Sequence, residues 1–149
     1  MEKADFMRRA IELSAASNKA EGDGPFGAVI VKDGKITGEG RNRVGSTLDP
    51  SAHGEIDAIR DACRNLGTSD LSGCELYTSC EPCAMCAAAI WWAGIERVYF
   101  AASAVDSRQA GLGSGTLSED IARPIEERSA PGEKMPGDEA IDVLKRWVG

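Results

Sequence analysis

Apolar residues along the chain repeat in two ways, and each way predicts a different kind of element. Residues 2–20 show the three- and four-residue spacing of an amphipathic helix. Residues 26–42 hold an apolar run, an Asp33-Gly34 turn and a second short run, which predicts a β-hairpin. The apolar positions on one face of the first segment are Phe6, Ala10, Leu13 and Ala16.

Beyond the hairpin, the pattern predicts helices and strands in alternation. Asp49 or Ser51 is placed to cap the helix that starts at residue 53. Strand–helix–strand alternation after a hairpin predicts an α/β fold in which helices flank a mixed sheet, with sites where loops meet strand ends and helix starts. The predicted elements are a loop at 44–51, a helix at 53–65, a strand at 74–79, a helix at 83–93, a strand at 97–103, a loop at 111–115 and short helices at 117–128 and 138–147.

Length and composition narrow the class of protein. A chain of 149 residues with 42% hydrophobic and 28% charged residues is typical of one globular domain. No apolar run approaches the roughly 18 residues of a membrane span. The charged N-terminal stretch lacks the apolar core of a signal peptide. We therefore expect a cytoplasmic protein with no membrane partner.

The net charge of −7 bears on possible partners. It disfavours a protein that holds nucleic acid mainly through phosphate contacts, although it is compatible with a local basic patch. Residues 132–149 hold more acidic than basic residues, so the chain has no basic arm at that end. We therefore expect no nucleic-acid partner.

The cysteines and the single histidine carry the strongest chemical signal. Five cysteines are an odd number, and three of them fall within residues 80–86, too close together for an ordinary disulfide framework. In a reducing compartment such a cluster indicates metal binding or catalysis. His53, Cys83 and Cys86 would give one imidazole and two thiolates to a zinc ion. Cys83 falls at a predicted helix start, where free N–H groups and the helix dipole favour the thiolate.

Three protein ligands would leave one tetrahedral position of the zinc ion open, which distinguishes a catalytic site from a structural one. Water in that position has its pKa lowered to about 7. Glu55, two residues after His53, can lie near that water and transfer its proton without binding the metal. The stretches HGE (53–55) and PCAMC (82–86) match the H-x-E…P-C-x-x-C signature of zinc deaminases.

Other interpretations of the same residues remain open. Cys80 continues the three-residue spacing of the cluster, so a closed four-ligand zinc site or an iron–sulfur site is one alternative. A zinc-stabilised interaction domain without catalysis is another, and Glu55 would then be an ordinary solvated carboxylate. Cys63 and Cys74 are expected to be small buried hydrophobic residues.

These residues together resemble the cytidine deaminase superfamily, and more narrowly the small bacterial guanine deaminases. The resemblance covers about residues 5–130. It implies a three-layer α-β-α fold with a five-stranded mixed sheet in the order 2-1-3-4-5, within a single zinc-dependent deaminase domain over residues 1–149. The segments that carry it are GPFGAVIVKDGKI (24–36), GEGRNRV (38–44), DPSAHGEIDAIRDAC (49–63), LYTSCEPCAMCAAAIWWAGIERVYFAA (76–102) and PIEERSAP (124–131).

The resemblance also implies the chemistry. One zinc ion per chain would be held by His53, Cys83 and Cys86, with Glu55 as the catalytic proton shuttle. The expected reaction is hydrolytic deamination of an aminopurine base, guanine to xanthine and ammonia, within purine metabolism. The resemblance gives Asp106 a place in the substrate pocket, whereas local sequence alone makes it a candidate helix cap. The residues expected to bind the substrate are Phe26, which packs on the base, Asn42, which hydrogen-bonds it, Gly54, whose backbone N–H faces it, and Asp106, which lines the purine pocket.

The resemblance further implies a homodimer that exchanges C-terminal segments, here about residues 131–149, so that each tail closes the partner's site. This chain departs from the family pattern in its tail, where Trp147 is the only aromatic residue, and at position 54, where glycine replaces the usual alanine. Both differences concern the substrate pocket and leave guanosine, cytosine, a pterin or a triazine as alternative substrates. The related tRNA adenosine deaminases share the zinc motifs, but PVGAV-like and LEPC-like stretches are expected there, where this chain has PFGAV and SCEPC.

Overall fold

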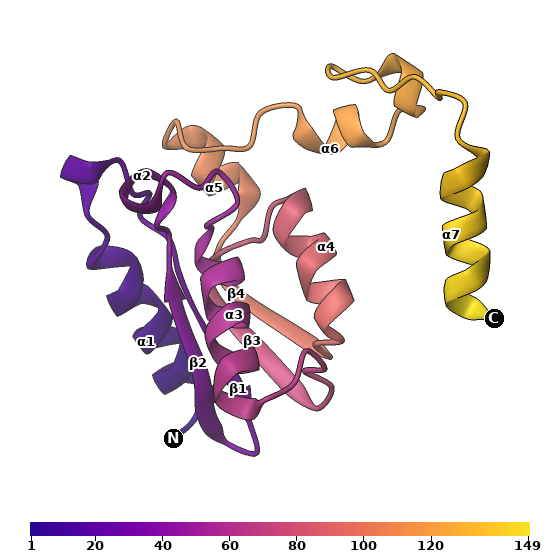
Figure 1. The fold of residues 1–149 in the computed structure, drawn as a ribbon. Helices are drawn as coiled ribbons and strands as arrows, with labels where there is room; N and C mark the ends of the chain where they lie inside the picture. Colours follow the sequence, from indigo (N-terminus) through magenta and orange to yellow (C-terminus); the bar gives the residue numbers. More distant parts are fainter. The chain divides into compact units, whose positions relative to one another are not determined.

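Residues 1–115 hold a helix, a hairpin and then helices in alternation with strands, as the sequence pattern predicts (Figure 1). The structure is a computed structural model that describes residues 1–149, and the chain divides into two units, residues 1–115 and 116–149. The elements of the first unit are α1 (Lys3–Ala15), η1 (Lys19–Glu21), β1 (Gly27–Lys32), β2 (Lys35–Arg41), α2 (Val44–Thr47), α3 (Gly54–Leu66), β3 (Cys74–Cys80), α4 (Ala84–Ala93), β4 (Arg97–Ala102) and α5 (Ala104–Gln109).

Four strands form one mixed sheet in the order β2-β1-β3-β4. β1 runs antiparallel to both of its neighbours, whereas β3 and β4, which are joined through α4, run parallel. The α/β class and the order of the first four strands are thus confirmed. The predicted fifth strand is wrong, because the residues after β4 form only helices and loops, and none of them pairs with the free edge of β4. β2 and β4 are therefore the two edges of the sheet.

The turn between β1 and β2 is the one that the sequence predicts. Asp33 and Gly34 both have positive φ angles, of 50° and 75°. Two positive φ values at the centre of a two-residue loop give a type I′ turn, whose twist matches that of the strands. The pairing register then shifts between Ile30 and Val31 of β1.

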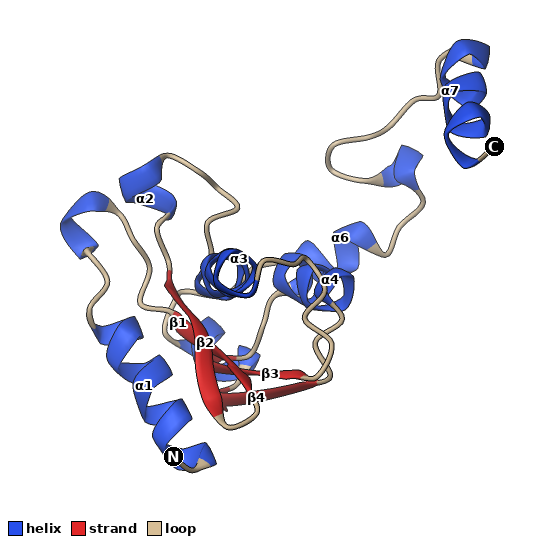
Figure 2. Cartoon of the chain, turned by 60° about the horizontal axis from the view of Figure 1, so that its bottom comes forward, coloured by secondary structure: helices blue, strands red, loops and turns tan.

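Helices cover both faces of this sheet, so the first unit has the expected three layers (Figure 2). α1 lies on one face, and α3 and α4 lie on the other. Successive residues of a strand point to opposite faces. Ala28 and Ile30 of β1 pack against α3 and α4. Val29 and Val31 pack with Phe6 of α1.

α3 lies very close to β2, because the strand has a glycine beneath the helix. A Cβ atom at Gly40 would collide with the Ala58 N atom and would lie 2.5 Å from the Gly54 O atom. Any side chain there would push the helix and the strand apart. Ala58 and Ala62, both buried, complete the close contact from the helix side. The glycine thus fixes the distance between the sheet and α3.

Three local predictions are wrong near the loops. The first helix ends at Ala15, earlier than predicted, and η1 follows as a separate turn. The predicted loop before α3 contains the single helical turn α2. Neither Asp49 nor Ser51 caps α3. Asp49 Oδ1 accepts hydrogen bonds from the Ser51 N–H and OH at 2.9 and 2.6 Å, a local bond that competes with capping, and His53 takes the N-cap position.

Residues 116–149 hold short helices. The single helix predicted at 117–128 is wrong, because Pro124 lacks the N–H that a continuing helix needs and separates α6 from η2. The helix predicted at 138–147 is confirmed as α7. The elements of this unit are α6 (Leu117–Ile121), η2 (Ile125–Glu127) and α7 (Asp138–Val148).

α7 is amphipathic, and its apolar side is uncovered within its own unit. Leu144 is 68% exposed and Trp147 is 89% exposed. Two of the three acidic residues of α7, Asp138 and Glu139, lie in its first turn and both basic residues lie in its last turn, which suits the helix dipole. None of the helices in the chain has both the length and the apolar character that crossing a membrane requires.

Candidate active site

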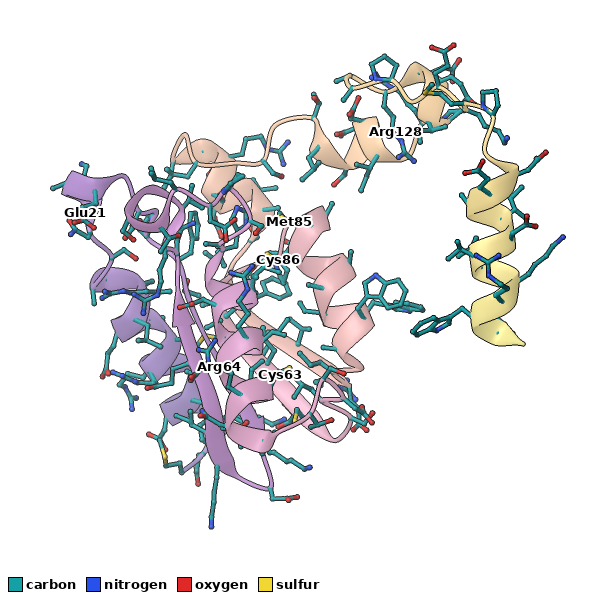
Figure 3. All side chains as sticks on the ribbon, viewed as in Figure 1. Glu21, Cys63, Arg64, Met85, Cys86 and Arg128 are labelled. Carbon is teal, nitrogen blue, oxygen red and sulfur yellow. The ribbon has the colours of Figure 1, made fainter.

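Two helices of the first unit begin beside each other, and each carries metal-binding residue types at its start. His53 is the N-cap residue of α3, and Cys83 is the N-cap residue of α4. Cys86 follows in the first turn of α4, where its side chain is buried (Figure 3). Helix N-termini have free N–H groups and the positive end of the helix dipole. Both favour the negative charge of a cysteine thiolate.

The spacing of the three side chains fits a zinc ion. His53 Nδ1 lies 3.6 Å from Cys83 Sγ and 3.5 Å from Cys86 Sγ. Tetrahedral zinc binds nitrogen at about 2.0 Å and sulfur at about 2.3 Å, which sets the two ligand atoms about 3.6 Å apart. The three ligand atoms all lie within 4.8 Å of one another, and no other cysteine or acidic residue joins them as a fourth ligand. One tetrahedral position is therefore left for a water molecule.

The two thiols of the cluster lose their protons unequally. A hydrogen bond from the Cys86 thiol, with a further contribution from His53, lowers the pKa of Cys83 to about 4. The contact with Cys83, together with burial, raises the pKa of Cys86. The Cys83 thiolate in turn raises the pKa of His53. The contact between the two thiols thus favours the thiolate form of Cys83, which is the form that binds a metal ion.

Glu55 lies in the first turn of α3, and its side chain is buried, at 6% exposure. Burial raises the pKa of its carboxyl group. The Cys86 thiol and the Glu55 carboxyl each affect the pKa of the other, so the carboxyl lies beside the cluster and not in bulk solvent. It is nevertheless not one of the clustered ligand atoms. A buried acid in this position can accept and return protons.

The remaining cysteines lie outside the cluster. Cys80 Sγ lies 3.9 Å from the Ser103 O atom, at the junction of β3 with the start of α5. Cys74 is fully buried in the core beneath α3 and α4, and Cys63 packs against the same core, as expected. None of the five cysteines forms a disulfide. The geometry thus favours the three-ligand site over the closed four-ligand alternative.

Asn42 is buried, and two backbone donors orient its side-chain amide. Its Oδ1 atom accepts hydrogen bonds from the N–H groups of Gly24 at 3.0 Å and Val44 at 3.1 Å. Because both partners are donors, the oxygen must face them, and the NH₂ group is left to donate elsewhere. The Asn42 N–H donates to Phe26 O at 2.9 Å, which makes these two predicted substrate residues neighbours.

Phe26 and Asp106 line one cavity of about 510 Å³ at the carboxyl ends of β3 and β4, whereas His53 and Glu55 do not line it. The Asp106 carboxylate accepts hydrogen bonds from the N–H and OH groups of Ser103, at 2.8 and 2.9 Å. The helix-cap role that local sequence indicated for Asp106 is thus present. One of its carboxylate oxygens is already engaged.

Gly54 is the first residue of α3 and lies against the start of β1. A Cβ atom at this position would lie 3.1 Å from Phe26 O and 3.3 Å from Gly27 Cα. A methyl group here would therefore point at the backbone of β1. The glycine lets α3 begin close to the strand, and it does not enlarge a space for substrate.

The sequence patterns miss one set of residues near the site. Asp57, Asp61 and Asn65 of α3 each bind a backbone group of β2. Their four-residue spacing was visible in the sequence and places them along one line of a helix. That spacing does not reveal their partner, because ordinary solvated helix faces have the same pattern.

A layered α/β fold in which two helix starts bring together one imidazole, two cysteine sulfurs and a buried, unligated carboxyl defines a zinc-dependent deaminase. The chain belongs to the cytidine and deoxycytidylate deaminase family, whose zinc-binding region matches residues 1–102. Zinc is accordingly its cofactor, and hydrolytic removal of an amino group is its class of reaction.

Individual relatives extend the likeness over nearly the whole chain. The guanine deaminase of Bacillus subtilis (strain 168) is 44% identical over 147 residues, which cover 99% of this chain and 94% of that protein. An X-ray structure of guanine deaminase from Bacillus subtilis superimposes with a TM-score of 0.94 at 43% identity, over 99% of this chain and 94% of that one. The tRNA-specific adenosine deaminase of Aquifex aeolicus (strain VF5) is 38% identical over 148 residues, 99% of this chain and 94% of that protein.

Proposed function

We propose that this protein deaminates a free aminopurine base and that guanine is its substrate, with xanthine and ammonia as products. The observation that carries the proposal is the buried Glu55 carboxyl beside a three-ligand metal cluster. The choice of guanine is supported by the 44% identity to a guanine deaminase over 99% of the chain.

His53, Cys83 and Cys86 would hold the zinc ion, which supplies Lewis acidity and lowers the pKa of a bound water to about 7. Glu55 accepts a proton from the attacking water and passes it to the ring nitrogen beside the amine-bearing carbon. Glu55 then takes the second proton of the water, from the hydroxyl group now on the ring carbon, and gives it to the departing amine. The carbonyl group forms, the carbon–nitrogen bond breaks, and the amine leaves as ammonia. Because burial raises its pKa, the same carboxyl can both hold and release a proton.

Asn42 and Phe26 are proposed to recognise the base. Since the Asn42 oxygen is engaged by two backbone N–H groups, its NH₂ group can only donate. Guanine offers it a carbonyl oxygen and ring nitrogens as acceptors. The Phe26 ring would pack on the base, and the Gly54 N–H, which has no intrahelical acceptor in the first turn of α3, would face it. Asp106, which lines the same cavity as Phe26, would line the purine pocket.

We further propose that residues 1–149 work as one deaminase domain in a cytoplasmic homodimer that exchanges about residues 131–149. The uncovered apolar side of α7 supports an exchanged tail, because a soluble monomer rarely leaves such a stripe exposed. Trp91 and Trp92 of α4, 74% and 79% exposed, support a second subunit contact. Free clustered cysteines suit a reducing compartment.

Ammonia release from a panel of amino-substituted rings tests the substrate. Zinc-loaded protein is expected to deaminate guanine, and to act weakly on guanosine, cytosine, a pterin and a triazine. Turnover of one of these rings in preference to guanine would keep the deaminase but replace the substrate. Adenosine in a tRNA anticodon stem-loop forms a separate arm, and inosine formation there would support an editing enzyme instead.

A further inference from the structure

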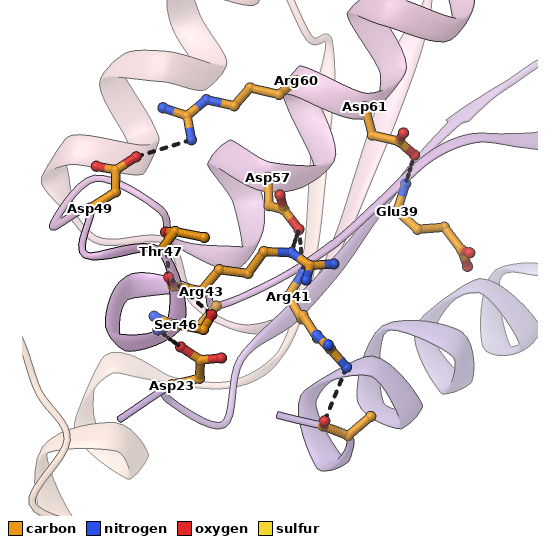
Figure 4. Close-up of polar contacts among 12 residues, drawn as sticks. Asp23, Glu39, Arg41, Arg43, Ser46, Thr47, Asp49, Asp57, Arg60 and Asp61 are labelled. Carbon is orange, nitrogen blue, oxygen red and sulfur yellow. Dashed lines mark hydrogen bonds and ion pairs between the residues drawn. The ribbon is translucent and has the colours of Figure 1, made fainter. Parts of the chain in front are cut away.

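Three side chains of α3 bind the outer edge of β2 in a regular ladder. All three come from one line of the helix, and all three reach backbone groups of alternate residues in the strand. Figure 4 shows the two contacts made by Asp57 and Asp61. The contacts are Asp57 Oδ2 with the Arg41 N–H at 3.1 Å, Asp61 Oδ2 with the Glu39 N–H at 2.9 Å, and Asn65 Nδ2 with the Thr37 O atom at 2.8 Å.

The periods of the two elements explain why the ladder can form. Four residues of an α-helix advance by about 6 Å. Two residues of an antiparallel strand advance by about 7 Å. Side chains four apart on a helix can therefore meet backbone groups two apart on a strand that runs beside it in the opposite direction. From its place on one face of the sheet, α3 thus supplies side-chain partners to backbone groups at the free edge of β2.

The ladder acts along the strand, whereas the close contact acts between helix and strand. The contact at Gly40 fixes how near α3 lies to β2, and apolar side chains of α3 such as Ile59 and Leu66 pack it against the core. Hydrogen bonds at 2.8–3.1 Å depend steeply on alignment, so a shift along the strand would break all of them together. Asp57 Oδ2 also accepts a hydrogen bond from Arg43 Nε at 2.9 Å, which ties in the loop that leads to α3.

We propose that Asp57, Asp61 and Asn65 are positioning residues that set where α3 lies along the sheet. The first turn of α3 carries one metal ligand and the proton-transferring carboxyl. The two cysteine ligands belong to α4, which follows β3, so the metal cluster closes only if α3 stops at the right place relative to β3. The inference rests on the proposed function only where it invokes turnover.

Zinc release from the folded protein tests the proposal without any substrate. Holoenzyme is mixed with an excess of a chromogenic chelator, and the release rate is compared for Asp57→Ala, Asp61→Ala and Asn65→Ala. The Asp57→Ala protein is expected to release zinc about tenfold faster than wild type, as is usual when support of a metal ligand is lost. The effect should decline for Asp61→Ala and again for Asn65→Ala, because each contact lies further from His53.

A conservative variant and a matched control complete the design. Asp57→Asn keeps an oxygen that can accept the Arg41 N–H, and it should restore most of the slow release. Glu96→Ala removes a comparable carboxylate-to-backbone bond, from the Gly73 N–H at 3.1 Å, and should release zinc at the wild-type rate. In turnover of guanine, kcat should fall in the same order as release rises, with KM little changed.

The possible results separate positioning from simple stabilisation. Lower unfolding temperatures in all three alanine variants, with unchanged zinc release, would show that the ladder only holds the fold together. Normal release combined with self-association would show that it only shields the edge of the sheet. Asp57→Asn as fast as Asp57→Ala would assign the effect to the Arg43 ion pair and overturn the proposal. If Asp57→Ala does not fold, the zinc release rates of Asp61→Ala and Asp57→Asn test the proposal in its place. If the protein proves inactive on guanine, the order of zinc release rates among the variants can still be measured, so failure of the proposed function is distinguishable from failure of this proposal.

Discussion

At the residue scale, the chemistry depends on the contrast between Glu55 and Cys83, one of the metal ligands beside it. Burial disfavours an ionised carboxyl, and it raises the pKa of Glu55. The hydrogen bond from Cys86 does the opposite for Cys83, whose pKa falls to about 4. Neighbouring groups are thus biased toward different protonation states, as proton transfer next to a metal-binding thiolate requires.

The Glu55→Gln variant should separate metal binding from proton transfer. Glutamine keeps the shape of the side chain but cannot carry the proton, so kcat should fall by about 10²- to 10⁴-fold. Zinc content, measured by atomic absorption, should remain that of the wild type, because Glu55 is not among the clustered ligand atoms. Loss of zinc from this variant would mean that Glu55 is itself a ligand.

The Gly54→Ala variant tests whether this glycine serves packing or specificity. The added methyl group would lie 3.1 Å from Phe26 O, so we expect destabilisation by about 1 kcal/mol from overpacking, read from urea unfolding. The ranking of substrates in the ammonia assay should not change. A variant of normal stability that selectively loses its larger substrates would show that the glycine makes room in the pocket.

The sequence predicts some of these residues well and others poorly, for a physical reason. Metal ligands and their acid need fixed chemical types at fixed spacings, so His53 and the P-C-x-x-C stretch were visible directly. The free NH₂ group of Asn42 was not, because its direction is set by the N–H groups of Gly24 and Val44, which only the fold brings together. For Asp106, local sequence indicated the helix cap, whereas its place in a cavity was expected only from the resemblance.

At the scale of elements, the site is assembled from two helix starts that meet on one face of the sheet. α3 reaches its place through close contact with β2, and α4 through the crossover between β3 and β4. The hairpin and both of these helices were predicted, because hydrophobic period and turn residues agree there. The fifth strand was expected from resemblance alone, with no hydrophobic pattern behind it, and the residues after β4 form helices and loops instead.

The Gly40→Ala variant should disturb the site from a distance. Its Cβ atom would collide with the backbone of Ala58, and helix and strand must separate to admit it. We expect a loss of about 3 kcal/mol in the free energy of unfolding, at the upper end for overpacking. Zinc release should also become faster, since α3 carries His53. Wild-type stability and release in this variant would mean that α3 does not depend on the close contact.

At the scale of the whole molecule, uncovered apolar surface is the feature that a single chain leaves unexplained. α4 has no charged residue, and it exposes Trp91 and Trp92. α7 exposes its own apolar side. A chain with a net charge of −7 repels its copies except where uncharged surfaces meet, so such surfaces are where a second copy can bind.

Mixing two inactive variants tests whether tails are exchanged and used by the partner. Glu55→Gln has a dead site and a normal tail, and a double variant, Leu144→Asp with Trp147→Asp, has a normal site and a disrupted tail. If each tail closes the partner's site, subunits that re-assort at equal amounts should recover activity in about a quarter of the sites, because half of the dimers are mixed and each has one complete site. Ammonia release after co-refolding measures this, with each variant refolded alone as the control.

If each tail serves its own subunit, no mixed dimer contains a complete site and the mixture stays inactive. A tail variant that is fully active alone would show that the apolar side of α7 is not needed for closure.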